Sequence, residues 1–278
     1  LLYRLVWLTG IVFWEVSRLA CCITQVFHTT QRILMSLGYH LTANELILIG
    51  KQRINSMAKK KKILILGAAG FLGSNMVRRV LKENDVIVTA VDSLDPDLYS
   101  SLDNLREVLS QIRFLQKDVT DPKVLKEIIP GHDIIYCCAA QTSHLRSVRD
   151  PLYDAKVNCI GILMLLEVVR TLNPGATVVY PSTSTIVGKA VADVIDENHR
   201  ERPLDIYSAN KAVADKYFQI YHSLHGLKTI ILRFANLYGP YGKPYSIFGF
   251  MNYFISLALA DKPITVYGDG AQKRNVMY

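Results

Sequence analysis

The sequence predicts an α/β protein built on a doubly wound parallel sheet. From residue 62 onward, short runs of Val, Ile and Leu alternate with longer amphipathic stretches, which is the pattern of repeated β-α-β units. The apolar runs are continuous, as expected for parallel strands buried on both faces. A glycine-rich turn follows the first run. With 278 residues, half of them hydrophobic, the chain can bury a large core.

The expected strands and helices alternate along the chain. We expect strands at 62–66, 86–91, 112–116, 133–138, 176–181 and 228–233, and helices at about 71–83, 101–110, 121–129, 151–172 and 204–225. A loop at 239–249 contains prolines and several glycines. Beyond it we expect a helix at 248–261 and a short strand at 263–267.

The first 57 residues differ from the rest. They have a surplus of three positive charges, four lysines follow at 59–62, and the remainder has a surplus of one, which together give the net charge of +8. A balanced body is not typical of nucleic-acid-binding proteins. The apolar stretch 5–27 contains Glu15 and Arg18, and a charge costs about 2.5–3.5 kcal/mol at the centre of a membrane helix. We interpret residues 1–57 as an extraneous head, with a membrane-surface anchor as the alternative.

Five cysteines stand at positions 21, 22, 137, 138 and 159, and none of them forms a CxxC pair. Their spacing is not that of zinc ligands. We therefore expect no metal site and reduced thiols, as in a cytoplasmic protein.

The glycine-rich turn has the sequence Gly67-Ala68-Ala69-Gly70-Phe71-Leu72-Gly73. Gly67 permits a tight turn, Gly70 lets the backbone approach a pyrophosphate, and Gly73 lets helix and strand pack closely. Free N–H groups at the start of the next helix favour phosphate. Glycine turns are common after strands, but this one joins the first strand to the first helix. It therefore predicts a dinucleotide-binding fold of the Rossmann type.

Acidic residues follow the second and third strands. Asp92 lies 25 residues after Gly67, where a carboxylate would bind the ribose hydroxyls and repel a 2′-phosphate, so NAD is favoured over NADP. The alternative for Asp92 is a solvated loop residue. Asp118 and Val119 would border the adenine, unless Asp118 only caps the next helix.

Tyr207 and Lys211 form a YxxxK pair whose side chains share one face of a helix. A neighbouring ammonium favours phenolate, so we expect the pKa of Tyr207 to fall toward neutrality, where the phenol can act as a base. Hydroxyl residues at 182–185 follow the fifth strand and would face the ligand crevice. The alternative is an ordinary cluster that satisfies its own backbone.

With these residues identified, residues 62–278 resemble the extended short-chain dehydrogenase/reductases, the family of UDP-galactose 4-epimerase and dTDP-glucose 4,6-dehydratase. The matching motifs are GAAGFLG, Asp92, Asp118-Val119, Ala139-Ala140-Gln141, Val157-Asn158, the STST segment with Gly188, YSANK, LRFANLYGP at 232–240, and Tyr267-Gly268-Asp269-Gly270 with Arg274. Val187 departs from the pattern, because a tyrosine usually precedes that glycine.

The resemblance implies a role for each matched residue. Thr183, five positions before Gly188, corresponds to the catalytic Ser/Thr and joins Tyr207 and Lys211. The cofactor would lie against residues of the glycine turn and of the strand ends, namely Gly67, Gly70, Phe71, Leu72, Gly73, Asp92, Asp118, Val119, Ala139, Ala140 and Gln141. It would also meet Tyr207, Lys211 and Asn158, of which Asn158 also supports the active-site helix. The substrate would meet Thr142, Thr183, Asn236, Tyr267 and Arg274. His144 and Arg146 would steer phosphate or lie on the surface.

The resemblance also implies the domains and the assembly. Residues 58–240 would form the NAD-binding domain, and 241–278 would begin a substrate-binding domain that is incomplete at its C-terminal end. Related proteins form homodimers through the two longest helices, so we expect the apolar run 160–169 and Val213, Tyr217 and Ile220 to form an interface, unless they pack on the sheet.

The resemblance finally implies a nucleotide-diphosphate sugar as substrate and NAD as cofactor. Dehydratases of this kind carry an Asp-Glu pair directly after the catalytic threonine, and decarboxylases keep the glutamate. Here these positions hold Ser184 and Thr185, which do not titrate near neutral pH. We therefore expect a 4-epimerase. The alternatives are a dehydratase, a decarboxylase, a keto-sugar reductase or a non-catalytic NAD-binding sensor.

Overall fold

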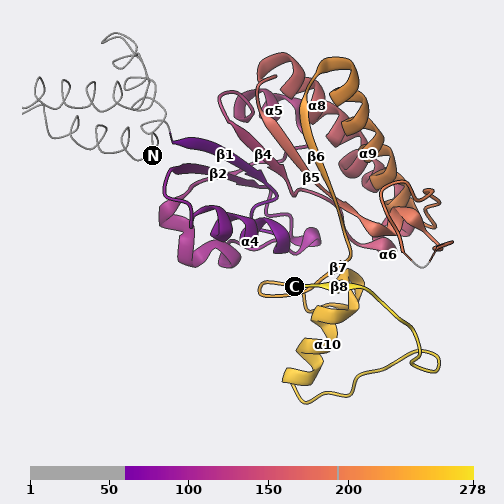
Figure 1. Cartoon of the computed structure of the whole chain (residues 1–278). Helices are drawn as coiled ribbons and strands as arrows, with labels where there is room; N and C mark the ends of the chain where they lie inside the picture. Colours follow the sequence, from indigo (N-terminus) through magenta and orange to yellow (C-terminus); the bar gives the residue numbers. More distant parts are fainter. Residues whose placement is uncertain (1–59, 193) are drawn as a thin grey trace, which may run out of the picture. The chain divides into compact units, whose positions relative to one another are not determined.

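The computed structural model describes residues 60–278 apart from residue 193, so the predicted head lies outside the described residues. Six parallel strands form the main sheet in the order β3-β2-β1-β4-β5-β6, which confirms the doubly wound fold (Figure 1). The strands are β1 Lys61–Leu66, β2 Val86–Asp92, β3 Arg113–Gln116, β4 Ile134–Cys137, β5 Thr177–Thr183 and β6 Lys228–Phe234.

Helices cover both faces of this sheet. One face carries α5 (Pro122–Ile128), α8 (Gly161–Leu172) and α9 (Ile206–His225), whose apolar side chains join Leu64 and Leu66 in one core. The other face carries α4 (Phe71–Val80) and the 3-10 helix η3 (Leu102–Gln111), which pack with Ile63 and Ile65 in a second core. Alternate residues of β1 thus face opposite cores, as a doubly covered strand requires.

The predicted helix 151–172 consists of three consecutive parts. A short helix α7 (Pro151–Ala155) leads into a π-helical turn η4 (Lys156–Ile160) and then into α8. A further short helix, α6 (His144–Arg149), begins after Ser143, whose hydroxyl accepts from the N–H of Arg146. The sequence pattern gives no sign of α6, because its six residues are too few to show a helical period.

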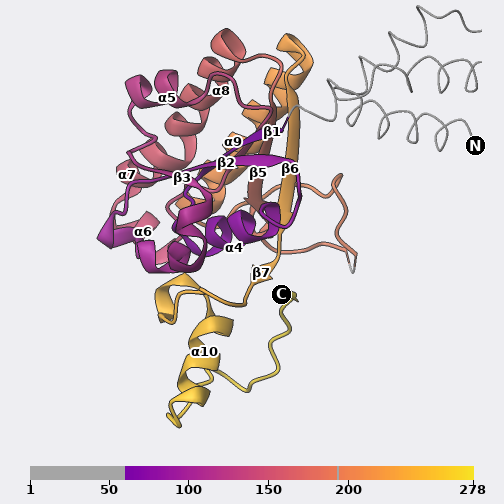
Figure 2. The ribbon, with the colours of Figure 1, turned by 90° about the vertical axis from the view of Figure 1, so that its left-hand side faces the viewer.

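Residues after β6 form a small second layer, which Figures 1 and 2 show beyond the carboxyl end of β6. It contains β7 (Asn236–Leu237), the 3-10 helix η6 (Ser246–Phe248), α10 (Phe250–Leu259) and β8 (Val276–Met277), and β7 pairs with β8. The expected strand 263–267 is wrong: this stretch is exposed and has no strand beside it, so its β-branched residues lack a partner. The domain boundary at residue 240 stays a prediction.

Cys137, Cys138 and Cys159 are free thiols, which agrees with the reduced state expected for them. The cytoplasmic location inferred from the cysteines stays a prediction. Within the described part of the chain, no helix is both long enough and apolar enough to cross a membrane.

Candidate functional site

The glycine turn lies at the carboxyl end of β1 and has two positions that accept only glycine. Gly67 has a φ of +74°, and a Cβ there would lie 2.5 Å from the backbone nitrogen of Ala139. A Cβ on Gly73 would lie 2.0 Å from the carbonyl oxygen of Gly67. Because neither residue has a Cβ, the turn can pack this closely against the end of β4 and the start of α4. Gly70 caps α4 without any side chain, which leaves the first N–H groups of the helix open to a ligand.

Asp92 ends β2 beside this turn. Its side chain is only 5% exposed, which excludes the alternative of a solvated loop residue. One carboxylate oxygen accepts from the N–H of Ala69 at 2.9 Å, and the other accepts from the N–H of Leu94 at 2.9 Å. The carboxylate is therefore fixed in orientation, and each oxygen keeps a lone pair for a further donor.

A cavity of about 460 Å³ runs along the carboxyl ends of the strands. Its walls include most of the residues predicted to bind cofactor or substrate: Gly67, Gly70, Phe71, Leu72, Gly73, Asp92, Asp118, Val119, Ala139, Ala140, Thr142, Thr183, Tyr207, Lys211 and Asn236. Asp118 is not a helix cap. It accepts from Thr120, while Asp121 caps α5.

Lys243 and Phe248 also line the cavity, although the sequence analysis did not single them out. Lys243 donates to the carbonyl oxygen of Leu98, and its ammonium lies 4.1 Å from the ring centroid of Phe248. Burial lowers the pKa of Lys243 to about 8, while the charge of Asp92 opposes this fall. No local motif connects residue 243 with the strand ends, so the sequence carried no signal for this placement.

Thr183 and Tyr207 meet at the end of the cavity formed by β5 and α9. Thr183 ends β5, and its hydroxyl accepts from the N–H of Thr185 at 3.2 Å and lies 3.0 Å from the Thr185 hydroxyl. Thr183 thus bonds to the backbone of its own cluster, the hydroxyl residues at 182–185, and these residues also line the cavity. Burial raises the pKa of Tyr207, the charges of Asp154 and Asp205 add to the rise, and the Thr183 hydroxyl opposes it.

The expected fall of the Tyr207 pKa toward neutrality is wrong for this structure. Lys211 turns its Nζ to the carbonyl oxygen of Pro181, at 2.6 Å, and over the ring of Tyr180. Burial lowers the pKa of Lys211 to about 8. Because burial and the two carboxylates hold the pKa of Tyr207 above its usual value, its hydroxyl keeps its proton and can donate a hydrogen bond.

Gln141 and Asn158 lie behind the cavity wall instead of lining it. Both are buried, and the Nδ2 of Asn158 donates to the backbone oxygen of Gln141 at 2.8 Å. Asp154, with no exposed surface, accepts from Gln141 at 2.6 Å and from Asn210 of the YxxxK segment at 2.8 Å. This network ties α7 and η4 to α9, so the structure gives Asn158 the supporting position that the resemblance implies.

Two predicted substrate residues lie away from the cavity. Tyr267 is 82% exposed, and Arg274 is exposed with its guanidinium donating to the carbonyl oxygen of Lys273. Neither side chain lines the cavity that holds Tyr207. Their roles in binding a base and a diphosphate remain predictions, which this arrangement does not support.

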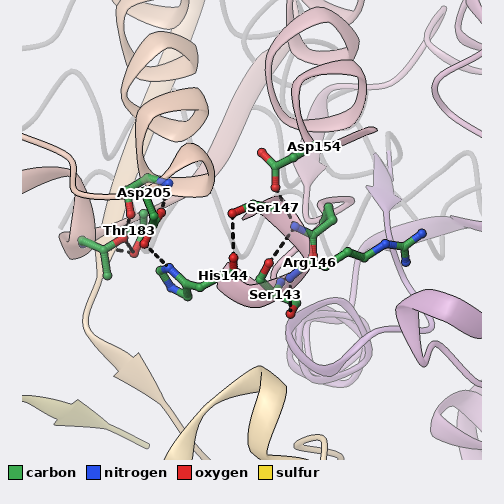
Figure 3. Close-up of polar contacts among 10 residues, drawn as sticks. Ser143, His144, Arg146, Ser147, Asp154, Thr183 and Asp205 are labelled. Atoms are coloured by element: carbon green, nitrogen blue, oxygen red, sulfur yellow. Dashed lines mark hydrogen bonds and ion pairs between the residues drawn. The ribbon is translucent and has the colours of Figure 1, made fainter. Parts of the chain in front are cut away.

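His144 has a more specific position than the sequence analysis indicated. It begins α6 and lines the cavity, and its Nδ1 lies 2.6 Å from a carboxylate oxygen of Asp205. Its ring contacts the ring of Tyr207 edge-on, with centroids 4.6 Å apart. Figure 3 shows the imidazole reaching across from α6 to Asp205, on the side where Thr183 lies. Arg146, by contrast, lies against Tyr153 and Asp97.

These features fit a dinucleotide. The glycine turn leaves no room for side chains at the start of α4, the uncapped N–H groups face the cavity, and a fixed carboxylate stands beside them. A diphosphate fits at the helix start and a ribose fits at Asp92. At the other end, Tyr207 and Lys211 come from one face of α9, where the reactive part of a cofactor and its substrate would lie.

Comparison with known proteins identifies the family. The model of the NAD dependent epimerase/dehydratase family matches residues 63–278. The putative UDP-glucose 4-epimerase of Methanocaldococcus jannaschii is 32% identical over 219 residues, which cover 78% of this chain and 69% of that protein. The dTDP-glucose 4,6-dehydratase of Streptomyces niveus is 30% identical over 225 residues, with 78% and 65% covered.

Solved structures show the same range of activities. The UDP-glucose 4-epimerase of Thermotoga maritima, solved with UDP-glucose, has a TM-score of 0.70 and 30% identity, and the match covers 78% of this chain and 69% of that one. The dTDP-glucose 4,6-dehydratase DesIV of Streptomyces venezuelae, solved with NAD, also has a TM-score of 0.70 and 30% identity, with 77% and 67% covered. The chain thus spans about two thirds of the length of these relatives.

Proposed function

This chain belongs to the NAD-dependent epimerase/dehydratase family and has NAD as its cofactor, and we propose that within this family it acts as a nucleotide-sugar 4-epimerase. Relatives at about 30% identity include both epimerases and dehydratases, so the family alone does not decide between the two reactions. The decision has to come from the residues around Tyr207.

One observation supports the epimerase. The carboxylates that line the cavity belong to Asp92, Asp95 and Asp118. They lie at the carboxyl ends of β2 and β3, which β1 and β4 separate from β5 in the sheet. The two positions after Thr183, where a dehydratase would need acidic groups, hold Ser184 and Thr185, and the Thr185 hydroxyl is engaged by Ser208 at 2.8 Å. The dehydratases that the chain resembles use carboxylic acids at these two positions to move protons during loss of water, whereas epimerisation at C4 needs a single proton-transferring group.

Each of these residues would have its own role in the proposed reaction. The start of α4 would hold the diphosphate of NAD, and Asp92 would hold a ribose. NAD, when bound, would supply reversible hydride transfer to and from the sugar. Tyr207 donates its proton to the oxygen on sugar C4 in one direction and takes it back in the other, and Thr183 hydrogen-bonds the same oxygen. Lys211, one turn along α9, can stabilise the phenolate form once its ammonium leaves the carbonyl oxygen of Pro181.

Product analysis tests this proposal. The protein is incubated with UDP-, GDP-, CDP- and dTDP-sugars, and the products are identified by NMR and mass spectrometry. We expect one of these to yield its C4 epimer with unchanged mass. A 4-keto-6-deoxy product, or carbon dioxide released from a sugar acid, would show that the enzyme is a dehydratase or a decarboxylase.

A further inference from the structure

Epimerisation at C4 leaves one group in the cavity unexplained. Tyr207 alone can take and return the C4 hydroxyl proton, yet His144 stands against it with ring centroids 4.6 Å apart and lines the same cavity. Imidazole both takes and gives a proton near neutral pH. A second proton-transferring group at this place would serve a carbon of the sugar other than C4.

Asp205 prepares His144 for such a role. One carboxylate oxygen of Asp205 lies 2.6 Å from Nδ1 of His144, and the other accepts from the N–H of Ser208 at 2.8 Å, where Asp205 caps α9. The cap fixes the carboxylate, and the carboxylate favours the tautomer in which Nδ1 carries the hydrogen. Nε2 is then an acceptor, and within the described part of the chain it forms no hydrogen bond. A carboxylate that orients a histidine in this way also stabilises the imidazolium once a proton has been taken.

We propose that His144, oriented by Asp205, is a second acid–base group that moves the proton on a sugar carbon adjacent to a keto group held by Tyr207 and Thr183. The substrate class is therefore a 4-keto nucleotide sugar. This inference rests on the proposed binding of nucleotide sugars in the cavity, but it does not depend on oxidation at C4.

The step balances without an oxidant. Nε2 of His144 takes the proton from the carbon next to the carbonyl, and the C–H electron pair forms the C=C bond of an enolate. The carbonyl oxygen receives the negative charge and accepts hydrogen bonds from the hydroxyls of Tyr207 and Thr183. Burial raises the pKa of Tyr207, so a phenol that keeps its proton can donate in this role. Return of a proton to either face of the carbon restores the ketone, with the original or the inverted configuration.

Deuterium exchange tests the step directly. The protein is incubated in D₂O with ready-made dTDP-4-keto-6-deoxyglucose, and deuterium at C3 and C5 is followed by NMR and mass spectrometry. We expect exchange above the uncatalysed rate. His144→Asn retains an amide N–H toward Asp205 but lacks Nε2, so it should lower the exchange rate by about 10²-fold or more. Exchange by this variant at the wild-type rate would overturn the proposal, as would wild-type protein that accelerates no exchange.

Two further measurements separate this role from a structural one. Asp205→Asn keeps a good helix cap but loses the charge, so its exchange rate should fall while its thermal unfolding midpoint stays close to that of wild type. His225→Gln, on the exposed end of α9, is the control and should exchange at the wild-type rate. Nitrogen-15 NMR of the imidazole should show hydrogen on Nδ1, and hydrogen on Nε2 alone would overturn the assignment. Failure of C4 epimerisation with the sugar panel would leave all these outcomes unchanged.

Discussion

Lys211 donates a hydrogen bond from Nζ to the carbonyl oxygen of Pro181, at 2.6 Å. This contact joins the helix that carries Tyr207 to the strand that ends in Thr183. The lysine is 3% exposed, so its charge is held by a backbone carbonyl and by the ring of Tyr180, 4.0 Å away. Lys211 therefore aligns α9 with β5, while burial makes its positive charge energetically unfavourable.

Replacement of Lys211 by methionine should change how stability depends on pH. Burial lowers the pKa of Lys211 from 10.5 to about 8, so between these values the unfolded state binds more protons than the folded state, and wild-type stability rises with pH. Relative to the variant, the unfolding free energy of wild type should increase across this window by on the order of 3 kcal/mol.

Urea unfolding of both proteins from pH 7 to pH 10.5 measures this difference. Groups whose pKa does not depend on Lys211, such as the phenol of Tyr221, cancel in the comparison. Below about pH 8 the difference should be constant, because the lysine is then charged in both states. A difference that does not change with pH at all would contradict the lowered pKa.

Tyr207→Phe should abolish epimerisation while it leaves NAD binding within a few-fold of wild type. The phenylalanine keeps the buried ring and its contact with His144 but has no proton to donate. The glycine turn and Asp92, which would hold the diphosphate and a ribose, belong to other elements. Calorimetric titration with NAD and product NMR check the two parts, and measurable turnover by the variant would show that Tyr207 is not the acid.

Thr183→Ala should lower the turnover rate by about 10²–10³-fold, as for the loss of one preorganised hydrogen-bond donor. Thr183→Ser keeps the hydroxyl and should recover most of the rate. Because the Thr183 hydroxyl also accepts from the N–H of Thr185, the alanine variant needs a stability check by thermal unfolding. A serine variant as slow as the alanine variant would mean that the threonine methyl group, and not the hydroxyl, matters.

The sequence predicted the sheet and the cofactor end of the site because these depend on local patterns. The apolar runs are continuous, and the glycine turn and Asp92 stand at short spacings within the first β-α-β unit, so Gly67, Gly73 and Asp92 were placed correctly beside one another. The expected strand 263–267 failed for the opposite reason: a strand needs a partner, and the composition of Ile264 to Val266 says nothing about whether a partner is present.

The electrostatics of the site could not be read from the sequence. Motif spacing placed Lys211 near Tyr207, but the balance between charge and burial depends on how deeply the pair lies in the protein. Asp154 influences Tyr207 from another element, and His144 meets Asp205 from 61 positions away. Long-range pairs of this kind leave no local signature.

We also expect a homodimer. Of the predicted interface, Ile162, Leu165, Leu166, Val168 and Val169 pack in the core, while Ile160, Val213 and Ile220 stay between 39% and 53% exposed. These three residues lie on η4 and α9, which contact each other. Ile220→Glu should therefore produce monomers in light scattering without loss of folding. A monomeric wild-type protein would refute the expectation.

NAD should bind at least about tenfold more tightly than NADP, a difference of about 1.4 kcal/mol. The carboxylate of Asp92 is fixed by the N–H groups of Ala69 and Leu94, so it cannot turn away from a 2′-phosphate, and the two negative charges repel each other.

Lys243 lines the same cavity, and burial lowers its pKa while the charge of Asp92 opposes this fall. A cation there attracts phosphate, so Lys243→Met should widen the preference for NAD, while Asp92→Asn should narrow it. Calorimetry with both cofactors measures the preference in each protein. Equal affinities in wild type would contradict the role of Asp92, and a preference unchanged by Asp92→Asn would place the discrimination elsewhere.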